Sequence, residues 1–367
     1  MIIGHRVKHK KFNLGTVTSI THDFFTVMFD ETIDGNDTRS FSYQSISSDF
    51  ELLNEDALVE LLRAKGCEGL FHMTDIMNLK KIIHDEKLYS RLHPKNQSVI
   101  DSANPHVIQH TNDKYKQFVR FYYKEKTPTY YNMEGILKEK TQGHIPIPCL
   151  LIFNLDITKL QPSRLANGNV SSVYTKVRDT HLSILDGYIY DMPWDRILGR
   201  GYYENEDYAE ETRVRNAEFL IKDEVSLHMV DKIIFRSGCE LEYAKKICPD
   251  LARYETECVK EYFNNIGLFT SKSVGNGYNI RLFFDDIDID YQDHNLVVNM
   301  YTDVAFGYLS KFNIGISFIN ERKELVNQEN LISSTQYSPY RFNLYSSVKP
   351  VRVKIYIDGI IYYIWER

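Results

Sequence analysis

The chain has 367 residues, of which 43% are hydrophobic and 13% aromatic, and its formal net charge is −6. This length allows two or three domains with cores of their own. The negative charge excludes a protein that binds nucleic acid through overall basicity, so any such binding needs a local basic patch.

The five cysteines are scattered and form no CxxC pair, which argues against a disulfide framework and against a cysteine-rich zinc site. This usage fits a reducing cytoplasm. The N-terminus lacks the apolar run of a signal peptide, and no segment approaches the roughly 18 apolar residues of a membrane span. We therefore expect a cytoplasmic protein with no membrane partner.

Residues 1–53 contain four runs rich in β-forming residues, at 4–9, 15–20, 24–30 and 39–43. This pattern resembles the small SH3-like or Tudor-like barrels attached to nucleic-acid proteins. Basic residues between positions 5 and 11 suit a docking module for nucleic acid or protein. A domain with a purely structural role, whose basic residues are simply exposed to water, explains these residues equally well.

Residues 54–66 have apolar residues at helical spacing and end at Gly66. A strand is expected at 69–74, followed by a helix from 75 to 83 with Thr74 or Asp75 as its N-cap. Further strands are predicted at 118–123, 149–153, 219–221 and 232–235, and helices at 178–198 and 240–247.

Beyond residue 265 the segments 278–290, 296–306, 312–318 and 351–365 are β-like, and the last is a hairpin that turns at Asp358-Gly359. Asp286, Asp288 and Asp290 share one strand face. They could hold a metal, but a solvated edge strand is the more typical explanation. We predict an α+β protein with a small β-barrel at 1–53, a mixed domain at 54–264 and a β-rich accessory domain at 265–367.

The segment 215–221 reads as a strand with one carboxylate among apolar neighbours. Alternation places Ala217, Phe219 and Ile221 on one face and Glu218 with Leu220 on the other. Glu218 must then face water, a polar cleft or a partner, because burying an unpaired carboxylate is costly. Taken alone, a glutamate at a sheet edge is the commoner explanation.

Four sequence blocks follow one another in order: FHMTDIMNL at 71–79, FVRFYYKEKTPTYY at 118–131, a stretch from NGNV at 167–170 through WDRI at 194–197 to GYY at 201–203, and RNAEFLI at 215–221. Together they resemble the DarT family of toxin ADP-ribosyltransferases, which modify nucleic-acid bases. The resemblance covers about residues 67–263. It implies an ADP-ribosyltransferase fold of two packed, mostly antiparallel sheets with helices, and NAD as co-substrate without a metal.

The resemblance assigns the catalytic role to Glu218. Cleavage of the nicotinamide–ribose bond passes through an oxocarbenium-like sugar that a carboxylate stabilises, and the carboxylate can also take a proton from the attacking base. His72 and Thr74 match the strand that binds the nicotinamide ribose, and Asn78 matches the asparagine of the NAD pocket. Without the neighbouring sequence blocks, His72 would be interpreted as a core histidine with its hydrogen bonds satisfied. Asn78 would be interpreted as a residue in the first turn of a helix.

Tyr122 and Tyr131 match aromatic positions beside the nicotinamide, and Tyr131 is the stronger candidate, although aromatic strand residues are usually core. The family's arginine on the NAD phosphates has no certain counterpart. Arg91, Arg120 and Lys126 are the candidates, and Arg120 stands where the family has a proline.

The basic residues from 114 to 126 fall on even positions and would share one strand face, with Lys116, Lys124 and Lys126 as a track for a phosphate backbone. A solvated strand face is the plain alternative. The loop that precedes Glu218 shapes the acceptor site in this class of enzyme, so we expect base contacts there. The candidate residues are Trp194, Tyr202 and Tyr203.

The leading hypothesis is a toxin-type mono-ADP-ribosyltransferase that transfers ADP-ribose from NAD to a base of single-stranded nucleic acid. DNA thymine is favoured, RNA is possible, and an antitoxin protein is the expected partner. The alternatives are a protein-directed ADP-ribosyltransferase or NAD glycohydrolase, and a non-catalytic nucleic-acid-binding protein. The intact His72, Asn78 and Glu218 speak against the last one.

Overall fold

The computed structural model describes residues 6–45, 49–52, 56–98, 100–101, 108–109, 111–135, 144–185, 187–200, 208–263, 284–301, 311–320, 325–334, 340–347 and 349–367. The chain divides into two units, Met1–Gly66 with Arg178–Met192, and Cys67–Val177 with Pro193–Arg367. The boundaries expected at 53 and 264 stay predictions. Within the described ranges, no helix is long and apolar enough to cross a membrane.

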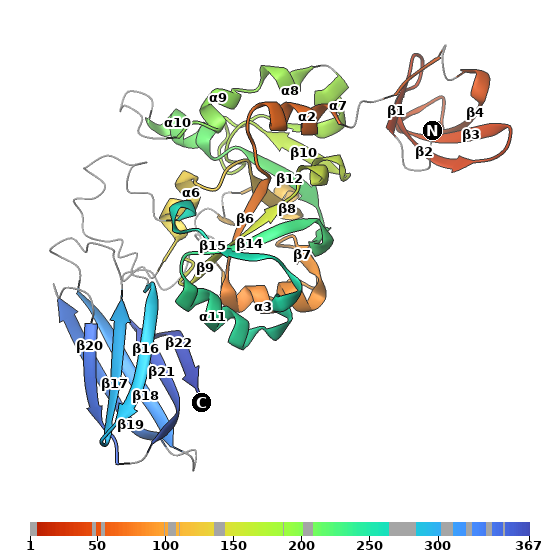
Figure 1. Ribbon diagram of the computed structural model, residues 1–367. Coiled ribbons are helices and arrows are strands. Elements are labelled where there is room, and N and C mark those ends of the chain that lie inside the picture. Colours follow the sequence, from red (N-terminus) through yellow and green to blue (C-terminus); the bar gives the residue numbers. More distant parts are fainter. Residues whose placement is uncertain are drawn as a thin grey trace. The chain divides into compact units, whose positions relative to one another are not determined.

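The first unit contains a five-stranded antiparallel sheet in the order β4-β3-β2-β1-β5 (Figure 1). Alternate residues of β3 are buried, at Phe25, Val27 and Phe29, so one face of the sheet builds the core. The four strands predicted at the N-terminus correspond to β1, β2, β3 and β4, and the sheet has a fifth strand, β5, that the sequence did not predict. Their bounds are β1 Arg6–His9, β2 Asn13–Ile20, β3 Phe24–Ile33, β4 Asn36–Ser42 and β5 Phe50–Leu52.

Helix α2 (Ala57–Ala64) follows, as predicted, after the 3-10 turn η1 (Tyr43–Ser45) and β5. The helical segment predicted at 178–198 is present from Thr180 onward, as three short helices. Gly187 adopts φ 75° and Pro193 lacks a backbone donor, so the helical pattern is interrupted at both residues. The short helices there are α7 Thr180–Leu185, α8 Tyr188–Asp191 and α9 Trp194–Ile197.

The second unit contains a mixed sheet whose strands lie in the order β10-β12-β8-β6-β9-β14-β15. Strands β14 and β15 pair in parallel, whereas β10, β12, β8, β6, β9 and β14 pair antiparallel in turn. The bounds are β6 Leu70–Asp75, β8 Phe118–Tyr122, β9 Pro148–Phe153, β10 Ser163–Ala166, β11 Val177–Asp179, β12 Glu218–Lys222, β14 Val230–Phe235 and β15 Thr256–Cys258.

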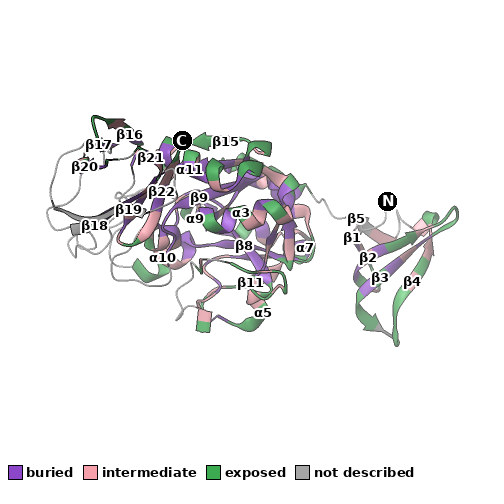
Figure 2. Ribbon diagram, turned by 90° about the horizontal axis from the view of Figure 1, so that it is seen from below, coloured by how far each residue is buried: buried purple, intermediate pink, exposed green. Residues whose placement is uncertain are grey.

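Every residue of β9 is buried, so this part of the sheet is covered on both faces. Figure 2 shows the same burial along the central strands. A separate two-stranded sheet pairs β7 (Lys87–Tyr89) with β13 (Glu224–Ser226). The other helices are α3 Ile76–Asp85, α5 Asp113–Lys116, α6 Pro128–Met133, α10 Tyr208–Arg215 and α11 Gly238–Ile247, with 3-10 turns η2 Leu155–Lys159, η4 Leu227–Met229, η5 Pro249–Arg253 and η6 Lys260–Tyr262.

The C-terminal part of this unit has a three-stranded sheet, β16-β17-β20, and a four-stranded sheet, β19-β18-β21-β22. The predicted hairpin is confirmed, because Asp358 and Gly359 join β21 to β22 with φ 47° and 83°. Asp286, Asp288 and Asp290 alternate along the exposed side of β16. The bounds are β16 Asp286–Gln292, β17 Asn295–Tyr301, β18 Lys311–Asn320, β19 Leu325–Ser334, β20 Tyr340–Tyr345, β21 Pro350–Ile357 and β22 Ile360–Glu366. The predicted α+β class is confirmed.

The junction between β6 and α3 depends on Asp75. Its carboxylate accepts hydrogen bonds from the backbone N–H of Met77 at 2.9 Å and of Ile147 at 3.0 Å. Burial raises the pKa of Asp75 to about 6. The expectation of an N-cap here is confirmed at Asp75.

We predict that Asp75→Ala lowers the free energy of unfolding by roughly 2–4 kcal/mol, because α3 loses its cap and the N–H of Ile147 loses its acceptor. Asp75→Asn keeps one acceptor oxygen and should fall between the wild type and the alanine variant. Urea unfolding measures all three proteins. An alanine variant that unfolds at the same urea concentration as the wild type would show that Asp75 holds neither element.

Candidate active site

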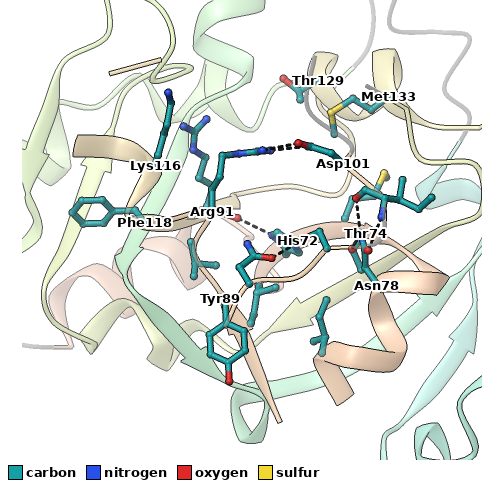
Figure 3. A pocket seen from close by; sticks show the side chains of 18 of the residues that line it. His72, Thr74, Asn78, Tyr89, Arg91, Asp101, Lys116, Phe118, Thr129 and Met133 are labelled. Carbon is teal, nitrogen blue, oxygen red and sulfur yellow. Dashed lines mark hydrogen bonds and ion pairs between the residues drawn. The ribbon is translucent and has the colours of Figure 1, made fainter. Parts of the chain in front are cut away.

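A cavity of about 690 Å³ opens in the second unit. This volume lies in the range of pockets that hold small molecules and cofactors. Figure 3 shows part of its lining. The lining residues that matter for chemistry include His72, Thr74, Arg120, Tyr122, Tyr130 and Glu218.

The cavity lies where β6 and β8 separate. These strands are neighbours in the sheet but pair at a single position, Phe71 with Tyr122. Side chains replace the missing ladder: the Tyr130 hydroxyl donates to the Phe71 carbonyl at 2.9 Å and accepts from the Met73 N–H at 3.0 Å. These two backbone groups of β6 are therefore hydrogen-bonded although β6 and β8 pair at one position alone.

His72 spans the same opening, with its Nδ1 lying 3.0 Å from the carbonyl oxygen of Arg120. A carbonyl oxygen only accepts, so Nδ1 carries the hydrogen. Burial lowers the pKa of His72, which favours the neutral ring. In the neutral ring, Nε2 is then an acceptor, which is the state needed to bind a sugar hydroxyl.

Glu218 begins β12, opposite Tyr122 in the antiparallel register, and its exposure is 0%. Its Oε2 accepts from the Val170 N–H at 2.9 Å, and its Oε1 accepts from the Tyr122 hydroxyl at 3.2 Å. Arg120 Nη1 lies 3.8 Å from Oε1. Burial raises the pKa of Glu218, whereas Arg120 and the two hydrogen bonds lower it.

Glu218 is thus no edge-strand glutamate, because β12 lies between β10 and β8. It shares the cavity with His72, as the sequence predicted. The hydrogen bonds fix both carboxylate oxygens, and the nearby guanidinium favours the ionised form.

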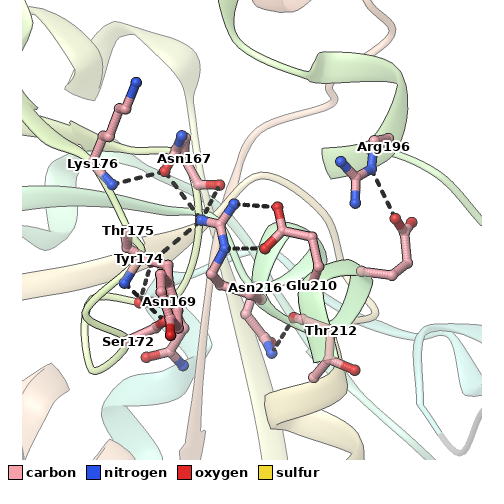
Figure 4. Close-up of polar contacts among 12 residues, drawn as sticks. Asn167, Asn169, Ser172, Tyr174, Thr175, Lys176, Arg196, Glu210, Thr212 and Asn216 are labelled. Atoms are coloured by element: carbon pink, nitrogen blue, oxygen red, sulfur yellow. Dashed lines mark hydrogen bonds and ion pairs between the residues drawn. The ribbon is translucent and has the colours of Figure 1, made fainter. Parts of the chain in front are cut away.

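The Val170 N–H that holds Glu218 belongs to a loop of residues 167–176, the bracing loop (Figure 4). Arg213 from α10 donates from Nη1 to the carbonyl oxygen of Asn167 at 3.2 Å and to Thr175 Oγ1 at 3.4 Å. Gly168 leaves room for this guanidinium, since a Cβ there would lie 2.3 Å from Arg213 Nη1. The loop therefore presents Val170 from a fixed position.

Thr74, Asn78 and Arg91, for which NAD binding stays a prediction, also line the cavity. The Asn78 amide donates to the Ile100 carbonyl at 2.9 Å and accepts from the Ile100 N–H at 3.0 Å, which ties the chain after residue 99 to α3. Arg91 forms a fork to Asp101 at 2.7 and 2.8 Å (Figure 3).

Positive charge predominates in the lining. Among the described residues it includes the carboxylates Asp101 and Glu218, and a larger group of cations. Each of these cations also has a carboxylate partner, so an anionic ligand would share the cations with existing ion pairs. The cations are Lys81, Lys87, Arg91, Lys116 and Arg120.

The aromatic lining differs from the prediction in one position. Tyr122 lines the cavity as expected, but Tyr130 does so in place of Tyr131. The reason is that α6 starts here, with Thr127 as its N-cap and Pro128 in the first turn. A threonine followed by proline is a helix-start signal, and it could have indicated the turn of the chain.

The prediction that the basic residues from 114 to 126 share one face of a strand is wrong. Residues 113–116 form α5, so Lys116 lies in a helix and only Arg120 of the proposed track lies in β8. Lys116 nevertheless lines the cavity, with its Nζ 2.7 Å from Asp113.

Two of the residues expected to bind nucleic acid are buried instead. Lys124 donates to the Gly199 carbonyl at 2.8 Å, and burial lowers the pKa of Lys124 to about 7. Trp194 is buried edge-on against Tyr123, with ring centroids 5.1 Å apart. Both side chains therefore pack the fold rather than face a ligand.

Lys126 is half-buried and is not part of the cavity lining. Tyr202 and Tyr203 lie outside the described residues. The sequence reasoning missed Lys81 and Lys87; Lys81 stands three residues after Asn78 on α3, a spacing that places both on one helix face.

None of the described residues forms a group of three or more His, Cys, Asp or Glu side chains that could hold a metal. All five cysteines are free thiols, four of them buried.

The family model of ssDNA thymidine ADP-ribosyltransferase, DarT, matches residues 71–263, which is more than half of the chain. Two solved structures of DarT from Thermus sp. 2.9 are similar. The complex with carba-NAD+ has 18% identity and TM-score 0.41 over 54% of this chain and 98% of that one. The complex with ADP-ribosylated ssDNA has 16% identity and TM-score 0.43 over 54% and 97%.

Thermosipho africanus DarTG in complex with ADP-ribose is similar at 15% identity and TM-score 0.40, over 53% of this chain and 50% of that one. No curated protein matched the sequence. The family match confirms the resemblance read from the four sequence blocks, and the chain belongs to the DarT family of NAD-dependent ADP-ribosyltransferases.

Proposed function

We propose that this enzyme transfers ADP-ribose from NAD to thymidine in single-stranded DNA. The observation that carries the proposal is Glu218, a buried carboxylate that faces a cation-lined cavity together with a neutral His72. The family match at residues 71–263 supports thymidine as the acceptor. An antitoxin protein is the partner that the family resemblance implies.

On the donor side, the nicotinamide ribose would lie between His72 Nε2 and Glu218. The pyrophosphate would lie toward the lining cations, among which Arg91 and Arg120 offer fork-shaped donors. Thr74 and Tyr122 complete the wall beside the ribose and the nicotinamide.

In the reaction, the bond between the nicotinamide nitrogen and ribose C1 breaks, and its electron pair leaves with neutral nicotinamide. A ring nitrogen of the thymine then bonds to C1, and its proton passes to Glu218. The ionised carboxylate stabilises the cationic sugar between these events. Burial brings the pKa of Glu218 nearer to the working pH, which helps it accept the proton.

On the acceptor side, the bracing loop carries Val173 and Tyr174, which are 90% and 81% exposed. Their loop also supplies the Val170 N–H to Glu218, so they stand close in the chain to the catalytic carboxylate. An aromatic ring on a braced loop suits stacking with an unpaired base. A base without a partner strand is reached without the cost of unstacking a duplex, which favours single-stranded DNA.

The function is tested with NAD labelled on its adenylate half, offered with single-stranded DNA, duplex DNA, RNA and total protein. We expect label on thymidine-containing single strands. Label on protein, or free ADP-ribose as the only product, would contradict the proposal. The matched variants are Glu218→Gln, which should lower the transfer rate by about a thousandfold, and Glu257→Gln, a half-exposed carboxylate of β15 that should change nothing.

We predict that Arg120→Gln moves the acidic limb of the pH profile for kcat/KM to higher pH. The guanidinium lowers the pKa of Glu218, so its removal raises that pKa and a higher pH is needed to ionise the carboxylate. Arg120→Lys keeps the charge and should move the limb less. An acidic limb that is identical in Arg120→Gln and wild type would show that Arg120 does not act on Glu218.

We predict that Tyr174→Ala raises the KM for single-stranded DNA by about tenfold, the loss expected for one stacked base. The KM for NAD should stay at the wild-type value, because Tyr174 is largely exposed and is not among the residues that line the cavity. Tyr345→Ala removes another exposed tyrosine, from β20, and serves as control. Equal KM values for single-stranded DNA in Tyr174→Ala and Tyr345→Ala would contradict stacking of Tyr174 on a base.

A further inference from the structure

A buried polar chain starts in the C-terminal sheets, at Tyr362 of β22. This side chain is fully buried, and its hydroxyl donates to Glu240 Oε1 of α11 at 3.0 Å. The same hydroxyl accepts from the backbone N–H of Phe284 at 2.9 Å. Tyr362 therefore joins the C-terminal sheets to α11, which lies beside β22 (Figure 1).

Glu240 continues the chain to Arg236, the residue that follows β14. Arg236 donates from Nε to Glu240 Oε2 at 3.0 Å and from Nη2 to Oε1, and both side chains are fully buried. Removing two charges from water is costly, and the attraction between them compensates only when the geometry is tightly satisfied. A buried pair of this kind therefore indicates a fixed position more strongly than it indicates stability.

The far side of Arg236 contacts the segment next to α6. Its Nη2 donates to the Pro146 carbonyl at 3.3 Å, and its Nη1 lies 3.5 Å from Glu134 Oε1. Glu134 directly follows α6, and Ile145 donates to the carbonyl of Met133 at 2.6 Å. One guanidinium thus holds both ends of the connection between α6 and β9.

Helix α6 is a wall of the cavity, to which it contributes Tyr130, Asn132 and Met133. We propose that Tyr362 is a positioning residue for NAD binding, which acts through Glu240 and Arg236 on Glu134 and so on the placement of α6. The C-terminal sheets are then a working part of the transferase rather than an appended module. This inference rests on the proposed use of the cavity for NAD.

The neighbouring tyrosine provides a matched control. The Tyr363 hydroxyl donates to Glu242 of the same helix at 3.2 Å, and Tyr363 also contacts Lys246. Neither partner contacts Arg236 by a described hydrogen bond or ion pair. Loss of the Tyr363 hydroxyl therefore removes a hydrogen bond between β22 and α11 but leaves the contacts from Glu240 through Arg236 to Glu134 unchanged.

The test compares Tyr362→Phe and Tyr363→Phe in the full chain. We expect the KM for NAD to rise about fivefold in Tyr362→Phe, with kcat within about twofold of wild type, because the lost hydrogen bond acts on binding through α6. Tyr363→Phe should leave both constants unchanged. A Tyr362→Phe enzyme with a lower melting temperature but the wild-type KM for NAD would overturn the proposal, since the hydroxyl would then serve folding alone.

A double-mutant cycle with Glu134→Gln tests the path itself. The effects of Tyr362→Phe and Glu134→Gln on the KM for NAD should be less than multiplicative, because both act on Arg236. Strictly multiplicative effects would contradict the coupling. If Tyr362→Phe does not fold, the KM for NAD of Glu134→Gln tests the proposal by itself. An unchanged KM for NAD in that variant overturns the proposal. A wild-type chain that binds no NAD would instead refute the proposed function.

Discussion

The site depends on the incomplete pairing of β6 with β8. If β6 and β8 paired along their whole length, no cavity would lie between them. If they separated and no side chain took over their hydrogen bonds, backbone donors and acceptors would be left unpaired in the interior, which is costly. The chain resolves the conflict with side chains. The Tyr130 hydroxyl makes hydrogen bonds with the backbone of β6, and the His72 ring makes one with the backbone of β8.

The same solution prepares the chemistry. Because Nδ1 of His72 is committed to a carbonyl, the ring presents its acceptor nitrogen. Glu218 enters the opening from the next strand, where burial and Arg120 act on its pKa in opposite directions. Its orientation comes from two hydrogen bonds, one from Tyr122 and one from the bracing loop. The fold thus supplies a fixed carboxylate and a neutral imidazole at one opening.

Much of the fold could be predicted from local patterns. Alternation located the strands, and the capping residue Asp75 marked the start of α3. The grouping of His72, Asn78 and Glu218 came from the family resemblance, because residues far apart in the chain meet only through the order of the strands. Periodicity alone assigned Glu218 more readily to an edge.

The errors also have physical causes. The even spacing of the lysines suggested a strand, but Asn112 caps α5 through the N–H of Lys114, and the chain turns helical there. Burial of Lys124 and Trp194 depends on the packing of α9 and of the chain that follows it, which no local pattern reveals. The path from Tyr362 to α6 joins residues more than a hundred positions apart, so it is visible only in the folded chain.

The most direct test of the central claim is a structure of the Glu218→Gln enzyme with NAD bound. We expect a hydroxyl of the nicotinamide ribose within hydrogen-bond distance, about 2.7–3.2 Å, of both His72 Nε2 and the side chain at position 218. The β6–β8 seam should remain open around it. A nicotinamide ribose bound away from both side chains would contradict the account.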